Sequence, residues 1–244
     1  MILEARNISQ SYEGEAVISN ISIQLKAGEI VCLIGTSGVG KTTLFHVLAG
    51  LTKPDKGEVR LENEVVTGQA GKISYMLQKD LLLPYRTIED NIILPLLIQG
   101  VSKKQARKQM EEFYSVFGLE GTAKKYPFQL SGGMRQRAAL LRTYMFSQKV
   151  ALLDEPFSAL DAITKRQMHQ WYLDIMQKIQ LSTIFISHDM DEAIMLSDRI
   201  YVMAGKPGRI VGEISIDHKG MTMDDFSFSD DFKETKKELL RLLQ

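Results

Sequence analysis

Short apolar runs bounded by polar or glycine-containing turns recur along this chain and predict buried strands. They are the runs Ile30–Ile34, Val150–Leu153, Thr183–Ile186 and Arg199–Met203. Runs this short and this rich in β-branched residues are typical of central strands. Near the N-terminus, residues 2–6 and 21–25 alternate between two faces, which predicts paired antiparallel strands. Buried strands separated by helical segments indicate an α/β fold with a largely parallel sheet.

The middle of the chain has helical periodicity instead. A charged surface helix is expected from Ser102 to Phe117, and prolines and glycine interrupt the pattern on either side of it. We expect residues 87–148 to form a helical subdomain inserted into the α/β core. Residues 217–244 are polar and end in an amphipathic segment, so a peripheral C-terminal tail is expected there. No internal repeat is found, and residues 1–244 are interpreted as one domain.

A phosphate-binding loop pattern follows the first buried run and precedes a predicted helix. Its glycines let successive backbone N–H groups turn inward and, with the helix N-terminus, cradle phosphate oxygens. Lys41 would place a compact charge on the β- and γ-phosphates, and the Thr42 hydroxyl would ligate Mg²⁺. The residues expected to bind nucleotide here are Gly35, Thr36, Ser37, Gly38, Val39, Gly40, Lys41, Thr42 and Thr43.

The second buried run ends in two carboxylates, which is the form of a Walker B strand. Such a strand presents its acids at the carboxyl edge of the sheet, where α/β proteins bind ligands. We expect Asp154 to hold Mg²⁺ through water, and Glu155 to polarise the attacking water as general base. The sequence therefore predicts that ATP and Mg²⁺ are bound and that ATP is hydrolysed.

Residues 130–137, Leu-Ser-Gly-Gly-Met-Arg-Gln-Arg, resemble the signature of ATP-binding cassette (ABC) ATPases. This motif opens a helix, so that its glycine amides (Gly132, Gly133) and the Ser131 hydroxyl can face an anion. The other interpretation of Ser131 with Gly132 is a simple helix cap. The resemblance covers residues 1–213. It implies a P-loop NTPase (RecA-like) parallel-sheet core with an N-terminal antiparallel β subdomain and the inserted helical subdomain.

Four further residues match functional positions of this family in order. Tyr12 resembles the aromatic residue that stacks on adenine. Gln78 resembles the glutamine that contacts Mg²⁺ or the lytic water and links the helical subdomain to the core. Asp161 ends a segment, Ser158–Asp161, that resembles the loop crossing the dimer interface. His188 resembles the switch histidine that hydrogen-bonds the γ-phosphate.

The family arrangement implies a head-to-tail homodimer, because the signature of one chain cannot fold back onto its own phosphate-binding loop. Each of two ATP molecules would lie between one loop and the opposite Ser131. Closure on ATP and reopening after hydrolysis would drive transmembrane permease subunits. The surface expected to contact them surrounds Gln78 and the flank Leu81–Arg86. A solute-binding protein outside the cell would complete the system.

The flank Leu81–Asn91 and the segment Met203–Ile210 resemble the nitrate, sulfonate and taurine importer branch, which also handles thiamine-precursor pyrimidines. Residues 142–144 depart from that branch, since Arg-Thr-Tyr replaces Ala-Arg-Ala. Three alternatives remain at this stage: an exporter motor, a soluble ABC protein that acts on ribosomes or DNA, and a catalytically dead cassette. The intact Lys41 and Glu155 disfavour the last, and no second cassette or long coiled coil supports the second.

Composition restricts where the protein can act. Its 30 basic and 30 acidic residues cancel, so the cationic surface of a nucleic-acid-binding protein is not expected. No apolar stretch approaches the roughly 20 residues of a membrane-spanning helix. The single cysteine, Cys32, excludes an intrachain disulfide and suits a reducing compartment. We therefore expect a cytoplasmic protein that reaches the inner face of the membrane through its partners.

Overall fold

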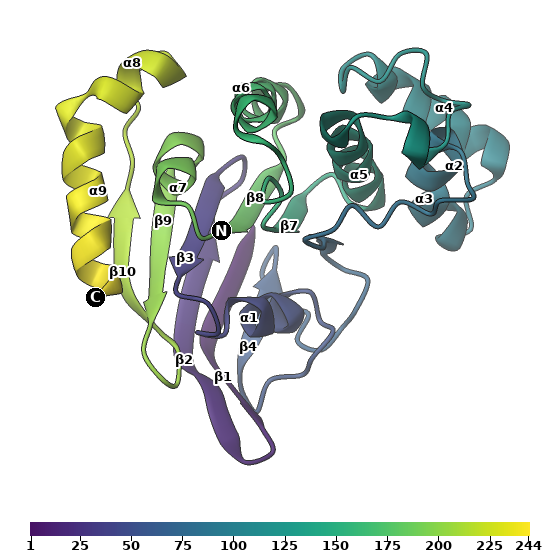
Figure 1. The fold of residues 1–244 in the computed structure, drawn as a ribbon. Coiled ribbons are helices and arrows are strands. Elements are labelled where there is room, and N and C mark those ends of the chain that lie inside the picture. The colour runs from purple at the N-terminus through teal and green to yellow at the C-terminus, as the bar shows by residue number, and fades with distance from the viewer.

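The computed structural model describes residues 1–244, and a six-stranded sheet forms the centre of the fold (Figure 1). Its order is β10 (Arg209–Ser215), β9 (Arg199–Ala204), β3 (Ile30–Gly35), β8 (Ser182–Ser187), β7 (Val150–Asp154) and β6 (Ser74–Met76). All neighbouring pairs are parallel except β10 with β9. The four strands predicted from apolar runs are thus confirmed, each within one or two residues of its expected bounds.

A second, antiparallel sheet is formed by the N-terminal third of the chain. Its order is β2 (Glu15–Leu25), β1 (Leu3–Tyr12), β4 (Lys56–Leu61) and β5 (Glu64–Val65). The pairing of β1 with β2 confirms the strands predicted from alternation. Register shifts interrupt both ladders of β1, and Asn7 there adopts a positive φ of 52°. Such bulges increase strand twist.

Nine α-helices flank the two sheets. They are α1 (Lys41–Leu48), α2 (Ile88–Ile92), α3 (Leu94–Ile98), α4 (Lys103–Tyr114), α5 (Gly132–Phe146), α6 (Ala162–Ile179), α7 (Met190–Leu196), α8 (Met223–Phe228) and α9 (Asp230–Leu243). Helices α2 to α5 gather at the β6 edge of the central sheet, whereas α8 and α9 lie at the β10 edge (Figure 1). Helix α4 is shorter than predicted, and α8 was not predicted. None of these helices is long and apolar enough to span a membrane.

Alternate residues of the central strands enter two separate hydrophobic clusters. In β3, Val31 and Leu33 face a cluster that includes α1 and the antiparallel sheet, whereas Cys32 and Ile34 face one that includes α5, α6, α7 and α9. Strands β7 and β8 divide their side chains in the same way. A parallel sheet covered on both faces requires such continuous apolar strands. The fold class predicted from the sequence is therefore correct.

A buried arginine connects the two sheets. Arg199 at the start of β9 donates two hydrogen bonds of 2.9 Å to the carboxylate of Glu29 and one of 2.7 Å to Glu213 in β10. It also donates to the Tyr201 hydroxyl and to the Gln24 carbonyl of β2, both at 2.8 Å. The Arg199 and Glu29 side chains are only 9% and 10% exposed. The planar guanidinium group thus donates to acceptors in four segments: β2, the turn before β3, β9 and β10.

We expect Arg199→Met to reduce the free energy of unfolding by about 3 to 5 kcal/mol, because it leaves the buried carboxylate of Glu29 unpaired. Urea unfolding followed by circular dichroism measures the loss. The matched control is Arg6→Met, which removes the ion pair of a half-exposed arginine with Glu4 and should have far less effect on stability. Equal losses in the two variants would contradict the connecting role of Arg199.

Candidate functional site

The phosphate-binding loop connects β3 to α1 as the sequence predicted. Gly40 is the N-cap of α1 and adopts a φ of 104°, which side chains rarely allow. A Cβ there would also lie 2.5 Å from Cγ2 of Ile18. No acidic residue lies in the first turn of α1. The helix therefore presents its N–H groups and its positive end to an anion.

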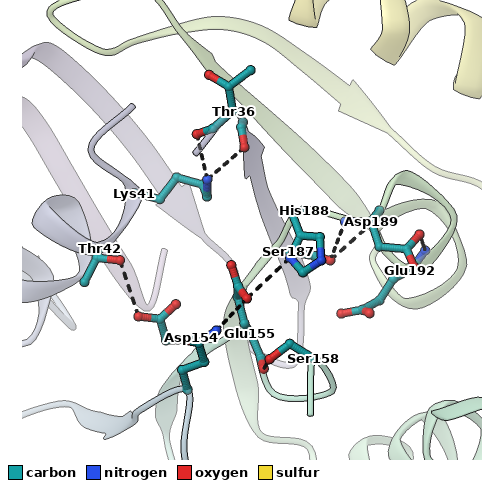
Figure 2. A network of polar contacts seen from close by, with 12 residues as sticks. Thr36, Lys41, Thr42, Asp154, Glu155, Ser158, Ser187, His188, Asp189 and Glu192 are labelled. Atoms are coloured by element: carbon teal, nitrogen blue, oxygen red, sulfur yellow. Dashed lines mark hydrogen bonds and ion pairs between the residues drawn. The ribbon is translucent and has the colours of Figure 1, made fainter. Parts of the chain in front are cut away.

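Lys41 is buried, and its ammonium group lies within its own loop. Nζ donates to the carbonyl oxygens of Gly35 at 2.8 Å and Thr36 at 3.0 Å (Figure 2). Burial lowers the pKa of Lys41, although the carboxylates of Glu155 and Asp154 act in the opposite direction. The lysine charge is thus held beside the loop in poor contact with water, where it interacts strongly with an anion.

Asp154 ends β7 facing the first turn of α1. Its Oδ2 accepts a hydrogen bond from the Thr42 hydroxyl at 3.5 Å and one from the Tyr75 hydroxyl of β6 at 3.2 Å. Burial raises the pKa of Asp154, the Glu155 charge adds to that effect, and the two hydroxyl groups oppose it. Burial also raises the pKa of Tyr75, so this hydroxyl remains a donor.

Glu155 directly follows β7 and lies beside Gln78 and His188. Its Oε2 accepts a 2.9 Å hydrogen bond from Nε2 of Gln78 and lies 3.4 Å from Nδ1 of His188 (Figure 2). Its backbone has a φ of 46°, an unfavourable value for glutamate that the 3.2 Å bond from its N–H to the Ile186 carbonyl helps to hold. Such backbone conformations cluster at functional sites.

These side chains surround a cavity of about 380 Å³ at the carboxyl ends of β3, β7 and β8. The predicted residues that line it are Ser37, Gly38, Gly40, Lys41, Thr42, Thr43, Asp154, Glu155 and His188. Val17 of β2 and Ile186 also line it and were not predicted. A larger cavity of about 690 Å³ lies between α6, α7 and residues 218–226. It lacks the lysine, the carboxylate pair and the loop amides, so the smaller cavity is the candidate site.

The donor groups fit a nucleotide and a magnesium ion. Loop amides and Lys41 suit phosphate oxygens. The Thr42 hydroxyl, the Asp154 carboxylate and the Gln78 amide oxygen are the hard oxygen ligands that Mg²⁺ prefers. No cluster of three or more His, Cys, Asp or Glu side chains could hold a metal by itself. Mg²⁺ usually binds one or two carboxylates together with substrate phosphates.

Nine predicted residues are not among those that line this cavity. Four of them adjoin it: Gly35 and Thr36 accept hydrogen bonds from Lys41, Val39 lies between Gly38 and Gly40, and Gln78 donates to Glu155.

The other five belong to other segments. Ser131 is the N-cap of α5, and its Oγ accepts from the Met134 N–H at 3.3 Å, so the helix-cap interpretation is confirmed for the single chain. Gly132 and Gly133 open the same helix near Leu160 and Met168. Asp161 is the N-cap of α6, and Tyr12 ends β1 with 45% of its surface exposed. Their predicted contacts with nucleotide remain predictions.

Three residues that support the site were missed. Tyr75 donates a hydrogen bond to Asp154 from β6, a short strand just before Gln78 that was not predicted. Gln136 in the signature helix is buried and donates to the Pro156 carbonyl next to Glu155. Gly208 approaches the phosphate-binding loop so closely that a Cβ would lie 2.1 Å from the Val39 carbonyl oxygen. The last contact joins segments that are about 170 residues apart, and no local pattern reveals it.

Arg142, which departs from the importer branch, connects α5 to the segment after Gln78. Its guanidinium donates to the carbonyl oxygens of Leu81 at 2.8 Å and Asp80 at 2.5 Å. Arg135, two turns earlier on α5, donates from Nε to the Asp80 carboxylate at 3.2 Å. The departure thus has a structural role, since it fixes this segment to the helix that begins at Ser131.

Comparisons with known proteins agree with this geometry. The family model described as ABC transporter matches residues 18–158. The formylaminopyrimidine import ATP-binding protein ThiZ of Halalkalibacterium halodurans is 42% identical over 84% of this chain and 81% of its own length. The nitrate import ATP-binding protein NrtD of a Synechocystis strain is 37% identical over 90% of this chain and 84% of its own length.

A solved structure is also similar, the dimeric post-hydrolysis state of the ATP-binding cassette MJ0796 bound to ADP and phosphate. It superposes with a TM-score of 0.73 at 27% identity, covering 88% of this chain and 99% of that one.

Replacing Asp154 tests the cost of its buried charge. A raised pKa means that folding disfavours the ionised carboxylate, so the cost is present at neutral pH and vanishes once the group is protonated in both states. Asp154→Asn keeps an acceptor for Thr42 and Tyr75. In the absence of nucleotide we expect it to melt at a higher temperature than the parent at pH 7, with the difference shrinking as the pH falls through the raised pKa towards the ordinary value of 3.8.

Adding Mg²⁺ and ATP should raise the melting temperature of Asp154→Asn less than it raises that of the parent, because the variant has lost a metal ligand. Asp174→Asn, at an exposed position of α6, is the control and should change neither comparison. A variant Asp154→Asn that melts below the parent at pH 7 would contradict the assigned desolvation.

Proposed function

Because the chain belongs to the ABC transporter family, we propose that it is the ATP-hydrolysing motor subunit of an importer of a small solute. The observation that carries this proposal is a half-complete site. Lys41, Asp154, Glu155 and His188 share one cavity, whereas the signature residue Ser131 lies outside it. Both named relatives are import ATP-binding proteins, which favours import over the exporter alternative.

The residues of the cavity have different roles in phosphoryl transfer to water. Lys41 and the loop amides hold the β- and γ-phosphates, and the general base is Glu155, kept in place by Gln78. As the water oxygen bonds to the γ-phosphorus, its proton passes to the Glu155 carboxylate and the bond to the β–γ bridging oxygen breaks, giving ADP and phosphate. Thr42, Asp154 and Gln78 would hold Mg²⁺, which would supply positive charge beside the phosphate oxygens. His188 donates to the γ-phosphate.

The second half of the site comes from another copy of this chain. Ser131 and Gly133, at the positive end of α5, would face the γ-phosphate bound by the opposite loop. Asp161 would cross the same interface, and Tyr12 would stack on the adenine. The dimeric cassette bound to ADP and phosphate supports this arrangement. Closure then requires ATP, because the nucleotide lies between the subunits.

The surface that contacts the permease is formed by the flank Leu81–Arg86, next to Gln78. Tyr85 is 93% exposed, and Leu81 and Leu83 are also exposed. The loop is nevertheless rigidly held: the Asn91 amide donates to the carbonyl oxygens of Leu83 and Arg86, and Arg142 holds its beginning. Exposed apolar side chains on an ordered loop are suited to a protein interface.

The loop begins just after Gln78, so nucleotide state can be transmitted through Glu155 and Gln78 to the membrane partner. We treat helices α2 to α5 as the unit that moves with it, and residues 217–244 as a peripheral tail. The protein would be cytoplasmic and bound to the inner face of the membrane through its permease. A solute-binding protein would deliver a small solute of the nitrate, sulfonate or thiamine-precursor type.

Glu155→Gln tests the assigned chemistry. Turnover should fall by about 10²- to 10⁴-fold, the usual contribution of a general base, while ATP affinity is kept because Lys41 and Asp154 remain. Since reopening depends on hydrolysis, this variant should accumulate as an ATP-bound dimer on size-exclusion chromatography. Adding Ser131→Arg should abolish that dimer. A Glu155→Gln variant that hydrolyses ATP at the parent rate would exclude Glu155 as the base.

Cross-linking tests the permease surface. Cys32 is buried, so a cysteine introduced at Tyr85 can be labelled selectively. We expect Tyr85→Cys to cross-link to the permease and Tyr85→Ala to reduce transport while the isolated subunit keeps its ATPase rate. The control is Phe228→Cys on α8, which is 79% exposed but belongs to the tail. Cross-links from Phe228→Cys and none from Tyr85→Cys would show that the surface is wrongly assigned.

A further inference from the structure

An ion-pair cluster outside the nucleotide cavity joins α6 to α7. Lys165 of α6 places Nζ 2.8 Å from Oδ2 of Asp189 and 2.8 Å from Oε2 of Glu192. Asp189 is the N-cap of α7, and Glu192 lies in its first turn. One lysine thus bridges two carboxylates from the neighbouring helix.

Each end of this bridge is adjacent to a residue of the proposed mechanism. Lys165 lies one turn into α6, and its backbone N–H donates at 2.8 Å to the carbonyl of Asp161. Asp161 ends the segment Ser158–Asp161, which crosses the dimer interface in the proposed function. At the other end, Asp189 directly follows His188, whose Nδ1 lies 3.4 Å from Glu155 (Figure 2).

Asp189 is fixed in more than one way. Its N–H donates to Oγ of Ser187 at 3.0 Å, and its Oδ1 accepts from the N–H groups of Asp191 and Glu192 at 3.0 and 3.2 Å. Oδ1 therefore caps the helix while Oδ2 binds Lys165. Burial acts to raise the pKa of Asp189, but the hydrogen bond from Lys165 and those from the α7 backbone hold it below its ordinary value.

The cluster is partly shielded from water. The Glu192 side chain is 4% exposed, that of Lys165 is 21% exposed and that of Asp189 is 38% exposed. His169, one turn after Lys165, lies with Nε2 3.6 Å from Glu192 and packs its ring edge-on against Phe157, which closely follows Glu155. A pair in such surroundings is much less screened than one on the open surface. It can therefore transmit a displacement of α6 to α7.

We propose that Lys165 and Asp189 are positioning residues that tie the interface segment Ser158–Asp161 to the switch histidine His188. When that segment settles against the partner subunit, α6 and its lysine hold Asp189, and with it His188, in place beside Glu155 and the γ-phosphate. The proposal rests on the proposed function, because it acts through the role of His188. It adds that correct placement of the histidine depends on contacts made at the dimer interface.

The sharpest test is Asp189→Asn in the full-length chain. Asparagine caps helices as well as aspartate does, and Lys165 still neutralises Glu192, so the fold should be unaffected. Only the charge that holds the loop after His188 is lost. Because misplacement by an ångström can cost about 100-fold in rate, we expect kcat for ATP hydrolysis to fall by about tenfold or more, with KM for ATP unchanged.

Asp191→Asn is the matched control, since Asp191 lies in the same turn and pairs with Lys236 of α9 instead of α6. It should leave kcat at the parent value. Lys165→Arg keeps both ion pairs and should be nearly as active as the parent. Lys165→Met should lower kcat as Asp189→Asn does, and combining the two should add no further loss. In the Glu155→Gln background, Asp189→Asn should still permit the ATP-bound dimer.

His188→Ala separates failure of this proposal from failure of the mechanism. If His188→Ala lowers kcat but Asp189→Asn does not, the link is absent while the switch role stands. If His188→Ala is as active as the parent, the role of His188 fails and the link fails with it. An equal loss of kcat in Asp191→Asn, or fully additive losses for Lys165→Met and Asp189→Asn, would overturn the proposal.

Discussion

The parallel pairing of β3, β8 and β7 is the constraint on which the site depends. Its register aligns Ile34 with Ser187 and Asp154 with Ile186, so that the phosphate-binding loop, the carboxylates and the switch histidine all leave the sheet at one edge. Slippage of one residue would turn every buried side chain to the opposite face. The apolar strands, sorted between two hydrophobic clusters, prevent this. The positions of the residues around the cavity are thus set by the packing of the core as well as by the loops.

The site itself is held at a cost to stability. Asp154 and Lys41 are charged but buried, and Glu155 adopts a positive φ. Each arrangement favours ligand binding or catalysis, and each would be avoided in a merely structural position. The Arg199 network lies outside the cavity, and one hydrophobic cluster reaches its wall at Ile186; together the network and the clusters supply the rigidity that holds these groups in place. Stability and function are therefore assigned to different parts of the same sheet.

Much of this could be predicted from local patterns. Short contiguous sequence patterns were enough to predict the phosphate-binding loop, the central strands and the acidic pair Asp154 and Glu155. The positions of Gln78 and His188 beside Glu155 required the family resemblance, because nothing local relates residues 78, 155 and 188. Tyr75, Gln136, Gly208 and the Lys165–Asp189 pair were missed because their roles arise only from tertiary contact. Ser131 shows the converse limit, since the same side chain caps a helix in the structure and is also predicted to contact nucleotide.

The central claim is that the active site is shared between two copies of this chain. The most direct measurement is ATPase activity after subunits carrying Lys41→Ala are mixed with subunits carrying Ser131→Arg and assembled on the permease. Each variant alone contains no intact pair of loop and signature, so each should be inactive. The mixed dimer contains one intact pair, and part of the activity should return. A mixture as inactive as its components, or a Ser131→Arg variant with parental turnover, would contradict a shared site.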